Sequence, residues 1–545
     1  MIREVFMDYD IVIVGAGIAG LTSAAYLSGN GYRVLVCEKE DKVGGLVNSF
    51  TFNGFTFDGG IRAIENSGIV FPMLKQLGIP IDFVKNNVSI GIENQVLRLK
   101  SKDSLADYQQ LLNDQFPESV EDIDKIIIEI KKVMKYMDVL YGIENPLFVD
   151  TLTDPKYLRE TILPWLVKYM TTIGKIQKLS MPIDEYLVKF TQNQTLIDMI
   201  AQHFFTKTPA FFALSYFSLY LDYQYPIGGT GVITQKLAQY ILDHGGEIRT
   251  RTQISRVNPQ ARITADEQGN EFHYKKLIWA ADLKMLYKMI DADTISDRKA
   301  RMKVAAQQKA VADKIGGDSI FTLYLTADMD KSYFESICSA HFFYTPLKKG
   351  LQNVRLSDLV INSAGPGKSV YTDDRQVITE WIRKYFAYTT YEIANPALRD
   401  AALAPDGRTG LIISTLMDYS IVKHISDCGW YDEFKTISEE CMIDVLDASI
   451  FPGLKAAVTA RFSSTPLTIE KLTGNSDGAI TGWSFTNEFI PVVTSFPKVA
   501  TSILTPIPDV FQAGQWSYSP SGLPISIMTG KLAADKADKQ LKKGK

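Results

Sequence analysis

The sequence predicts an α/β protein whose chain opens on a buried parallel β-sheet. Three observations lead to this prediction: an apolar, β-branched run over 9–14, the turn G-x-G-x-x-G that follows it, and a second apolar run that ends at Glu38. Strands of a parallel sheet are covered on both faces, so they read as short apolar runs. The order strand, glycine turn, helix, strand and acid is that of a Rossmann-type βαβ unit.

The glycine turn predicts a bound dinucleotide. Gly15 permits the tight turn, Gly17 lets the backbone approach a pyrophosphate, and Gly20 lets the following helix lie close to the strand. We expect that helix over 18–27, with the free N–H groups and positive dipole end of its first turn facing the phosphates. Glu38 is placed to accept hydrogen bonds from an adenosine ribose.

Three blocks of sequence resemble the phytoene desaturase-like flavoproteins, a family that includes carotenoid isomerases and retinol saturases. The first combines the turn with the Gly-Gly pair Gly44–Gly45 and the segment "GFTFDGG" at 54–60. The second is "YPIGGTGVITQKLAQYILDHGGEIRTRTQISRV" at 225–257, and the third is "DVFQAGQWSYSPSGLPISIMTGKLAADK" at 509–536. This resemblance implies that the dinucleotide is FAD.

The turn and the resemblance together imply a set of FAD-contacting residues. Ile254 is the position expected to meet the adenine, and Gln515 stands where many relatives have an acid that binds the ribityl chain. Leu46 stands where many relatives carry arginine. The full set is Gly15, Gly17, Ile18, Ala19, Gly20, Glu38, Lys39, Gly44, Gly45, Leu46, Gly59, Gly60, Ile61, Ile254, Gly514, Gln515, Gly522, Leu523 and Pro524.

The three blocks lie far apart in the chain, so both domains are predicted to be discontinuous. The fold implied is a glutathione reductase-like, Rossmann-type FAD-binding domain with an α+β substrate domain. The FAD-binding segments are 1–75, 222–290 and 500–545, the last including a C-terminal helix. The substrate domain comprises 76–221, which is mainly helical, and 291–499.

Catalytic side chains are harder to assign. The sequence has no Ser/His/Asp grouping, and none of its five histidines lies in an H-x-x-x-H or comparable arrangement, so we predict no metal. Arg62 follows the flavin-side glycines and is a candidate for stabilising negative charge; the alternative is a salt bridge with Glu65. Tyr518 is a candidate proton donor, and the alternative for it and for Trp516 is ring packing.

Composition limits the partners. The net charge of −4 offers no broad basic field for nucleic acid, and four scattered cysteines fit a reducing cytoplasm. The longest apolar stretch, 209–221, is shorter than the roughly 20 residues that a membrane span needs. We therefore expect a cytoplasmic protein. The tail from Lys531 carries six lysines, which suit either peripheral membrane contact or a solvated helix end.

These observations favour an FAD-dependent oxidoreductase or isomerase acting on carbon–carbon double bonds of a small lipophilic, polyene-like substrate. Saturation, desaturation and cis/trans isomerisation all remain open. The segment "DGGI" at 58–61 resembles retinol saturase-like proteins, and this resemblance favours a reductase or isomerase. No second strand-linked G-x-G-x-x-G is visible, so the electron donor or acceptor is expected to be external. The aromatic stretch 203–225 fits a polyene site or a plain core. Alternatives are an amine or porphyrinogen oxidase-type flavoenzyme and a non-catalytic flavin- or lipid-binding protein.

Overall fold

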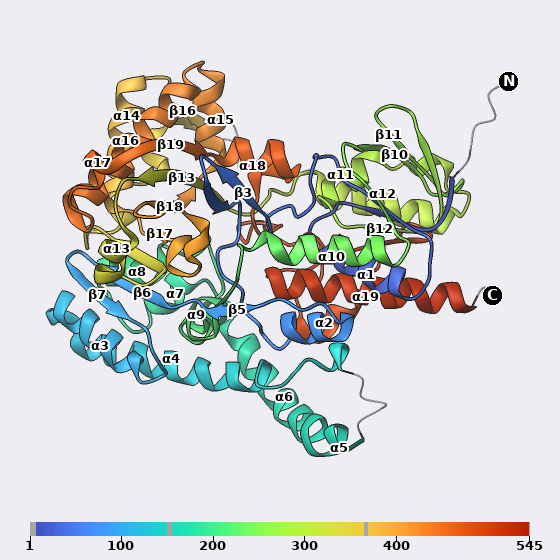
Figure 1. Cartoon of the computed structure of the whole chain (residues 1–545), viewed down its shortest axis with the longest axis horizontal. Helices are drawn as coiled ribbons and strands as arrows, with labels where there is room; N and C mark the ends of the chain where they lie inside the picture. Colours follow the sequence, from blue (N-terminus) through green and yellow to red (C-terminus); the bar gives the residue numbers. More distant parts are fainter. Residues whose placement is uncertain (1–6, 150–154, 364–368, 544–545) are drawn as a thin grey trace.

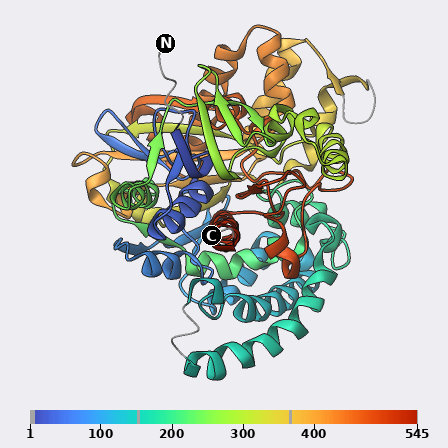
Figure 2. The same cartoon turned by 90° about the vertical axis from the view of Figure 1, so that its right-hand side faces the viewer.

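The computed structural model describes residues 7–149, 155–363 and 369–543, and two seven-stranded sheets form its frame. Figure 1 shows the two sheets at opposite ends of the molecule, with both chain termini beside the first sheet. Figure 2 looks almost along the C-terminal helix α19, which runs through the middle of the molecule.

The first sheet has the strand order β10-β11-β12-β1-β2-β9, with β20 also paired to β12. The pairs β12–β1, β1–β2, β2–β9 and β12–β20 are parallel, whereas β10, β11 and β12 form an antiparallel meander. Its strands are β1 (Met7–Val14), β2 (Val34–Cys37), β9 (Glu247–Arg249), β10 (Ile254–Asn258), β11 (Ile263–Asp266), β12 (Glu271–Trp279) and β20 (Val510–Gln512).

Both faces of this sheet are covered, which is why β1 is apolar along its whole length. Ile11 and Ile13 pack on one side against helices α1, α10 and α19, which lie next to one another in Figure 1. Val12 and Val14 pack on the other side against α11 and α12. The expected opening unit is therefore present: β1, then α1 (Ile18–Gly29), then β2.

The second sheet has the order β19-β13-β18-β17-β14-β6-β7 and is antiparallel except for the pair β14–β6. One face carries Phe321, Phe342 and Ile393 into a core closed by α14, α15 and α16. The opposite face, here called the inner face, is turned toward α4, α8 and α9. Its strands are β6 (Val88–Ile92), β7 (Gln95–Arg98), β13 (Ser319–Ala327), β14 (His341–Thr345), β17 (Tyr391–Ala394), β18 (Thr409–Met417) and β19 (Val458–Ser464).

Short strands and helices complete the fold. The two-stranded sheets are β3 (Ser49–Phe52) with β4 (Phe55–Asp58), β5 (Phe83–Lys85) with β8 (Gln224–Pro226), and β15 (Val360–Ser363) with β16 (Ser369–Tyr371). The remaining helices are α2 (Val70–Leu77), α3 (Ser104–Gln115), α4 (Val120–Leu140), α5 (Pro155–Tyr157), α6 (Leu163–Ile176), α7 (Ile183–Leu187), α8 (Gln194–Ala201), α9 (Ala210–Asp222), α10 (Gly231–Asp243), α11 (Leu283–Met289), α12 (Arg298–Ala312), α13 (Lys331–Ile337), α14 (Arg375–Tyr388), α15 (Tyr419–Asp427), α16 (Tyr431–Ser449), α17 (Leu454–Ala457), α18 (Pro466–Thr473) and α19 (Leu523–Lys543).

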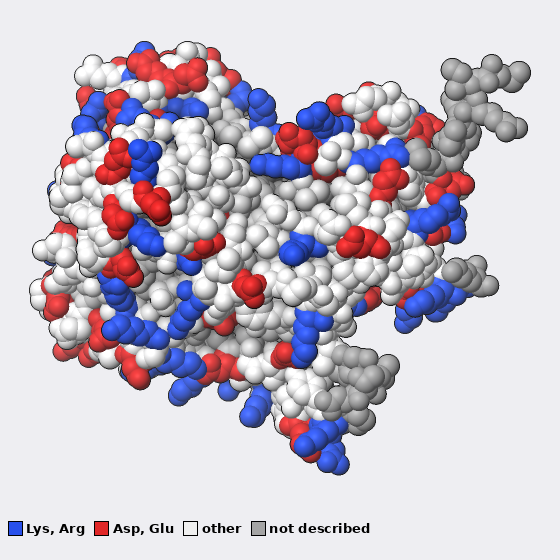
Figure 3. All heavy atoms as spheres, viewed as in Figure 1, with Lys and Arg blue, Asp and Glu red and all other residues white. Residues whose placement is uncertain are grey.

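The surface has no dominant charge on the face drawn in Figure 3, where basic and acidic side chains are interspersed. Among the described residues, no helix combines the length and the hydropathy needed to cross a membrane. One element does stand away from the body of the molecule: α5 and α6 project from its lower edge in Figures 1 and 2.

Candidate flavin site

The glycine turn lies between β1 and α1. It leaves an open space beside Gly17, which we call the cradle. A Cβ built on Gly20 would lie 1.9 Å from the carbonyl oxygen of Gly15, so helix and strand touch there. Gly15 itself has φ +99° and packs against Ala280. At Gly17, by contrast, a built Cβ meets no atom within 4 Å. Gly17 is therefore not required by the fold, and its open side fits a ligand that approaches the backbone.

Glu38 lies directly after β2 and turns its carboxylate toward the same cradle. Oε2 accepts a hydrogen bond from the Ala16 N–H at 2.8 Å, and Oε1 accepts one from the Glu40 N–H at 3.0 Å. Burial raises the pKa of Glu38, although these two N–H groups oppose that shift. Glu38 is thus fixed beside the turn, where a ribose would lie if the cradle holds a pyrophosphate.

The second glycine segment folds directly against the first. Gly17 and Gly44 form a parallel bridge, and a Cβ built on Gly45 would lie 3.4 Å from the Gly17 Cα. Gly60 approaches Leu46 closely enough that a built Cβ would lie 2.2 Å from the Leu46 carbonyl oxygen. Gly59 makes the same close approach to Asn48, and Ile61 donates its N–H to the Leu46 carbonyl at 3.0 Å.

The C-terminal block closes on the same helix start. A Cβ built on Gly514 would lie 3.2 Å from the Ala19 Cβ, in the first turn of α1. Further along, Gly530 of α19 crosses α1 so closely that the Ser23 hydroxyl donates to its carbonyl at 2.8 Å. Leu523 and Pro524 begin α19, so this helix also aims its N-terminus at the cofactor region. All three sequence blocks therefore converge.

Three other predicted contact residues, Ile254, Gln515 and Lys39, lie in different surroundings. Ile254 is buried in the same hydrophobic cluster as Val14 and Cys37, the last residues of β1 and β2. Gln515 is half-buried in the turn between β20 and α19. The Lys39 ammonium instead pairs with Glu40 at 3.0 Å and donates to the Lys471 carbonyl. Contact of any of these side chains with a flavin stays a prediction.

Asp58 joins the first two blocks, a role that the sequence analysis missed. Its carboxylate accepts hydrogen bonds from the Tyr225 hydroxyl at 2.7 Å, the Thr230 N–H at 2.8 Å and the Ser49 hydroxyl at 2.9 Å. Asp58 is fully buried, so these partners are what allows a carboxylate there. The acid of "GFTFDGG" therefore fixes "YPIGGTG" beside the glycine segment.

Arg62 is bound by a row of side chains on the inner face of the second sheet. Thr322, Ser414 and Glu392 lie directly opposite one another on β13, β18 and β17. The Arg62 guanidinium donates to the Ser414 hydroxyl at 2.5 Å and to the Thr322 hydroxyl at 3.4 Å, and it pairs with the Glu392 carboxylate at 3.0 Å. Arg62 does form a salt bridge, but with Glu392; the expected partner Glu65 was wrong, because residues 61–66 form no helix that would bring positions i and i+3 together. A part for Arg62 in stabilising negative charge stays a prediction.

Glu392 stands out because it is both accessible and strongly acidic. β17 is the central strand of its sheet, yet the Glu392 side chain keeps 35% of its surface exposed. Water-accessible space therefore reaches the inner face. Burial by itself raises the pKa of Glu392, but Arg62, His341 and Arg399 outweigh that effect and lower the pKa to about 2. Glu392 is thus ionised at neutral pH.

Glu65 is the opposite case, a carboxyl group kept close to neutral. Among the described residues no hydrogen bond or ion pair reaches it, and its Oε1 lies 3.7 Å from a Cβ built on Gly522, in the turn that begins α19. Burial, with a further contribution from Asp222, raises the pKa of Glu65 to about 7. A carboxyl group with that pKa exchanges protons readily at neutral pH. Sequence reasoning weighed Glu65 only as a partner for Arg62.

A row of aromatic rings lies near both carboxyl groups; we call Phe204, Tyr216, Tyr220, Tyr223 and Phe343 the aromatic wall. Successive ring centroids lie 5.0 Å (Phe204–Tyr216), 5.5 Å (Tyr216–Tyr220) and 4.9 Å (Tyr220–Phe343) apart. After burial, both Glu65 and Glu392 contribute to raising the pKa values of Tyr216 and Tyr223. Both carboxyl groups therefore lie near enough to these tyrosines to act on them electrostatically.

Tyr518, the predicted proton donor, is 3% exposed, and its hydroxyl donates to the Thr494 carbonyl at 3.4 Å. Burial raises its pKa further above the ordinary value. Neighbouring Trp516 packs edge-on against Trp483, with ring centroids 4.9 Å apart. This geometry favours ring packing for Trp516, and a catalytic part for Tyr518 stays a prediction.

Comparison with known proteins decides the family. A family model described as flavin containing amine oxidoreductase matches residues 18–326. The chain belongs to this family. Flavin-dependent oxidoreductase chemistry, predicted from the sequence, is thereby confirmed, as is the α/β fold class with a Rossmann-type domain.

Curated relatives agree with the resemblance to phytoene desaturase-like proteins. Prolycopene isomerase of Daucus carota is 22% identical over 86% of this chain and 71% of its own length. A 4,4'-diapophytoene desaturase (4,4'-diaponeurosporene-forming) of Staphylococcus aureus is 23% identical over 98% of this chain and 99% of its own length. Among solved structures, an oxidoreductase from Methanosarcina mazei covers 97% of this chain and 99% of its own with a TM-score of 0.59 and 15% identity. Putrescine oxidase covers 98% and 100% with a TM-score of 0.57 and 13% identity.

Proposed function

We propose that the protein binds FAD and acts on carbon–carbon double bonds of a lipophilic, polyene-like substrate. The observation that carries this proposal is the aromatic wall, because its tyrosines lie near both Glu65, which faces the turn before α19, and the accessible Glu392 on the inner face. A long apolar substrate needs an extended aromatic surface with few polar groups. The names of the two curated relatives, an isomerase and a desaturase of carotenoids, support the same substrate class.

The residues present fit FAD in particular. Gly17 offers an open approach to a pyrophosphate at the N-terminus of α1, and Glu38 lies where an adenosine ribose would be bound. Ile254, buried in the same cluster as Val14 and Cys37, would meet the adenine. When bound, the flavin supplies hydride or electron exchange with a carbon–carbon bond. The redox partner is expected to be an external donor or acceptor.

Four side chains are assigned parts in this proposal. Glu65, through Oε1, takes up or releases the proton that accompanies the change at the double bond. Tyr216, which is half-buried on α9, contacts the polyene through its ring. Arg62 and Glu392 form a neutral pair that ends the apolar surface, so a substrate carbon chain stops at the inner face.

We also propose that α6 binds a membrane surface. Leu163, Leu166, Val167 and Met170 have the i, i+3, i+4, i+7 spacing of one helix face, and all are exposed, Val167 by 68% and Met170 by 63%. Over 155–179 the chain carries five cations and one acid, against a net charge of −4 overall. An exposed apolar stripe flanked by cations is typical of helices that lie on anionic lipid. The peripheral membrane contact that the sequence analysis considered for the lysine tail is here assigned to α6. A lipid substrate would enter the protein from this helix.

One experiment separates the proposed function from its alternatives. The purified protein is mixed with a panel of polyenes and with a panel of amines, while flavin absorbance and hydrogen peroxide are followed. A spectral change or a new product with a polyene alone supports the proposal. Peroxide formation with an amine supports an amine oxidase, and a flavin that responds to neither panel supports a non-catalytic binding protein.

A further inference from the structure

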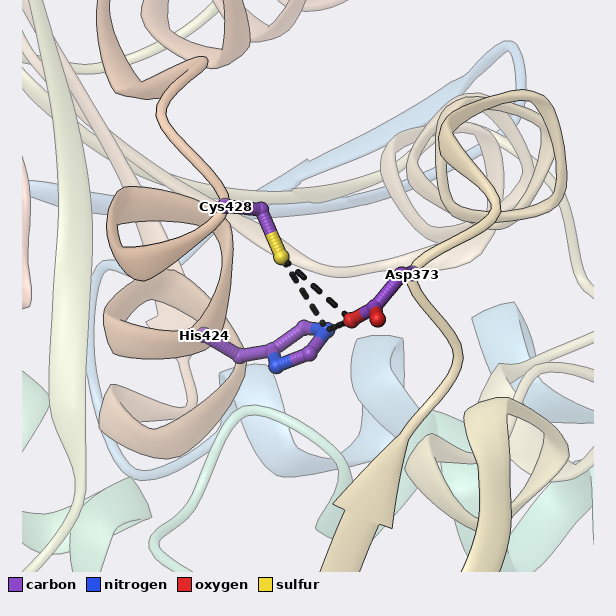
Figure 4. Close-up of side chains that lie close together, drawn as sticks. All are labelled: Asp373, His424 and Cys428. Carbon is purple, nitrogen blue, oxygen red and sulfur yellow. Dashed lines mark hydrogen bonds and ion pairs between the residues drawn. The ribbon is translucent and has the colours of Figure 1, made fainter.

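Three metal-ligating side chains converge outside the flavin site, on the outer side of the second sheet. His424 lies on α15, and Cys428 is the residue that ends this helix. Asp373 comes from the segment just before α14. Figure 4 shows the imidazole, the thiol and the carboxylate pointing to one spot between α15 and this segment. The His-x-x-x-Cys spacing places two ligands on one helix face.

The three distances match the edges of a zinc coordination shell. His424 Nε2 lies 3.3 Å from Asp373 Oδ1, Cys428 Sγ lies 3.5 Å from Asp373 Oδ1, and Cys428 Sγ lies 3.7 Å from His424 Nε2. Tetrahedral Zn²⁺, with bonds of about 2.1 Å to nitrogen and oxygen and about 2.3 Å to sulfur, places nitrogen and oxygen about 3.4 Å apart and sulfur about 3.6 Å from each. Each observed distance agrees with its expected edge to about 0.1 Å.

The surroundings suit an open, three-ligand site. The His424 side chain is 20% exposed and is held at the edge of the Tyr371 ring, whereas Asp373 is 83% exposed. Solvent thus has access to a fourth coordination position. His424 Nε2 also lies 3.0 Å from the Thr372 carbonyl oxygen, so in the metal-free protein a proton on this nitrogen is shared with that carbonyl. On metal binding that proton would move to Nδ1, so that Nε2 coordinates as a neutral imidazole, and the thiol would lose its proton.

We propose that Asp373, His424 and Cys428 bind one divalent metal ion of the Zn²⁺ class, with water as the fourth ligand. Imidazole and thiolate together select such ions over Mg²⁺ or Ca²⁺, which prefer oxygen. The bound ion ties α15 to the segment before α14. This site is separate from the proposed flavin chemistry.

The test uses the full chain with its flavin, after removal of any affinity tag and treatment with a chelator. Titration with Co²⁺ is expected to give thiolate-to-cobalt charge-transfer and tetrahedral d–d absorption that saturate at one equivalent and are displaced by Zn²⁺. Cys428→Ser is expected to abolish the charge-transfer band. His424→Ala is expected to weaken metal binding by more than about tenfold, because mutation of a residue that only hydrogen-bonds to a ligand already costs about that much affinity. The matched control is Cys441→Ser, a half-buried thiol on α16.

Two results would overturn the proposal. The first is a titration with no saturable charge-transfer band. The second is a band that survives in Cys428→Ser, or that disappears in the Cys441→Ser control. Because all the substituted side chains lie at or near the surface, loss of the band together with an unchanged circular dichroism spectrum identifies a ligand and not a folding defect.

Discussion

Replacing Glu392 with glutamine tests whether the inner face depends on its ion pair. The pKa of Glu392 falls from 4.5 to about 2 in the folded protein, and a shift of about 2.5 units corresponds to about 3.4 kcal/mol. Because the side chain is 35% exposed, solvent screening reduces this value, and we expect Glu392→Gln to cost about 2 kcal/mol. For a cooperative unit of about 250 residues, that is a fall in Tm of about 4 °C.

The sign of the pH dependence follows from the lowered pKa. A carboxyl group whose pKa is depressed in the folded state contributes stability above its unfolded pKa, near 4.5, and loses it as the pH falls toward 2. Urea unfolding at a series of pH values should therefore show a constant difference between wild type and Glu392→Gln from pH 7 to about 5, which narrows below that.

Two further variants make the result interpretable. Asp138→Asn removes an exposed partner of Lys102 and should change the free energy of unfolding by no more than about 0.5 kcal/mol. Arg62→Met combined with Glu392→Leu removes both charges and should recover most of the loss. If Glu392→Gln is as stable as wild type at pH 7, the assignment of Arg62 to this pair is refuted.

Three other predictions concern the flavin site and α6. Gly17→Val should fold normally, because no atom lies within 4 Å of the new Cβ, but the purified protein should lose its flavin absorbance. Glu65→Gln should remove an inflection near pH 7 from the plot of reaction rate against pH. Because the pKa of Glu65 is raised in the folded state, the wild-type protein should also lose up to about 3 kcal/mol of stability as the pH rises from 4.5 to 7. The variant should not show this loss. Val167→Glu with Met170→Glu should reduce flotation with anionic vesicles at least about tenfold.

Each of these predictions has a matched control. Gly174→Val also enters open space and should keep its flavin, so flavin loss there would make the Gly17 result uninformative about the cradle. Glu185→Gln is exposed and should leave the pH profile unchanged. Leu242→Glu places a charge on an exposed apolar residue outside α6, and vesicle binding that falls equally in this variant would argue against α6 as the contact.

The sequence predicts the structure well where contacts between residues close in the chain determine it. The strand, turn and helix at the start of the chain were predictable because Gly15 and Gly20 are required by close backbone contacts, and those contacts follow from spacing alone. Convergence of Gly514 on Ala19 was expected only through the resemblance, since no local pattern relates residues almost 500 positions apart.

The rest depends on tertiary contacts that no local pattern encodes. Arg62 meets Glu392 across 330 positions because three strands happen to align in one register. The raised pKa of Glu65 results from burial, which the sequence does not report. The cluster of Asp373, His424 and Cys428 was not predicted, because a His-x-x-x-Cys pair is a weaker sequence pattern than His-x-x-x-His and because Asp373 comes from a different element.

The most direct test of the central claim is anaerobic. One portion of the purified protein is kept oxidised and one is reduced, and each is mixed with the same polyenes, with product masses measured. Our account predicts a new polyene product: two hydrogens heavier from the reduced portion, two lighter from the oxidised portion, or an isomer of equal mass from the reduced portion. No polyene product from either portion, together with turnover of an amine, would contradict it.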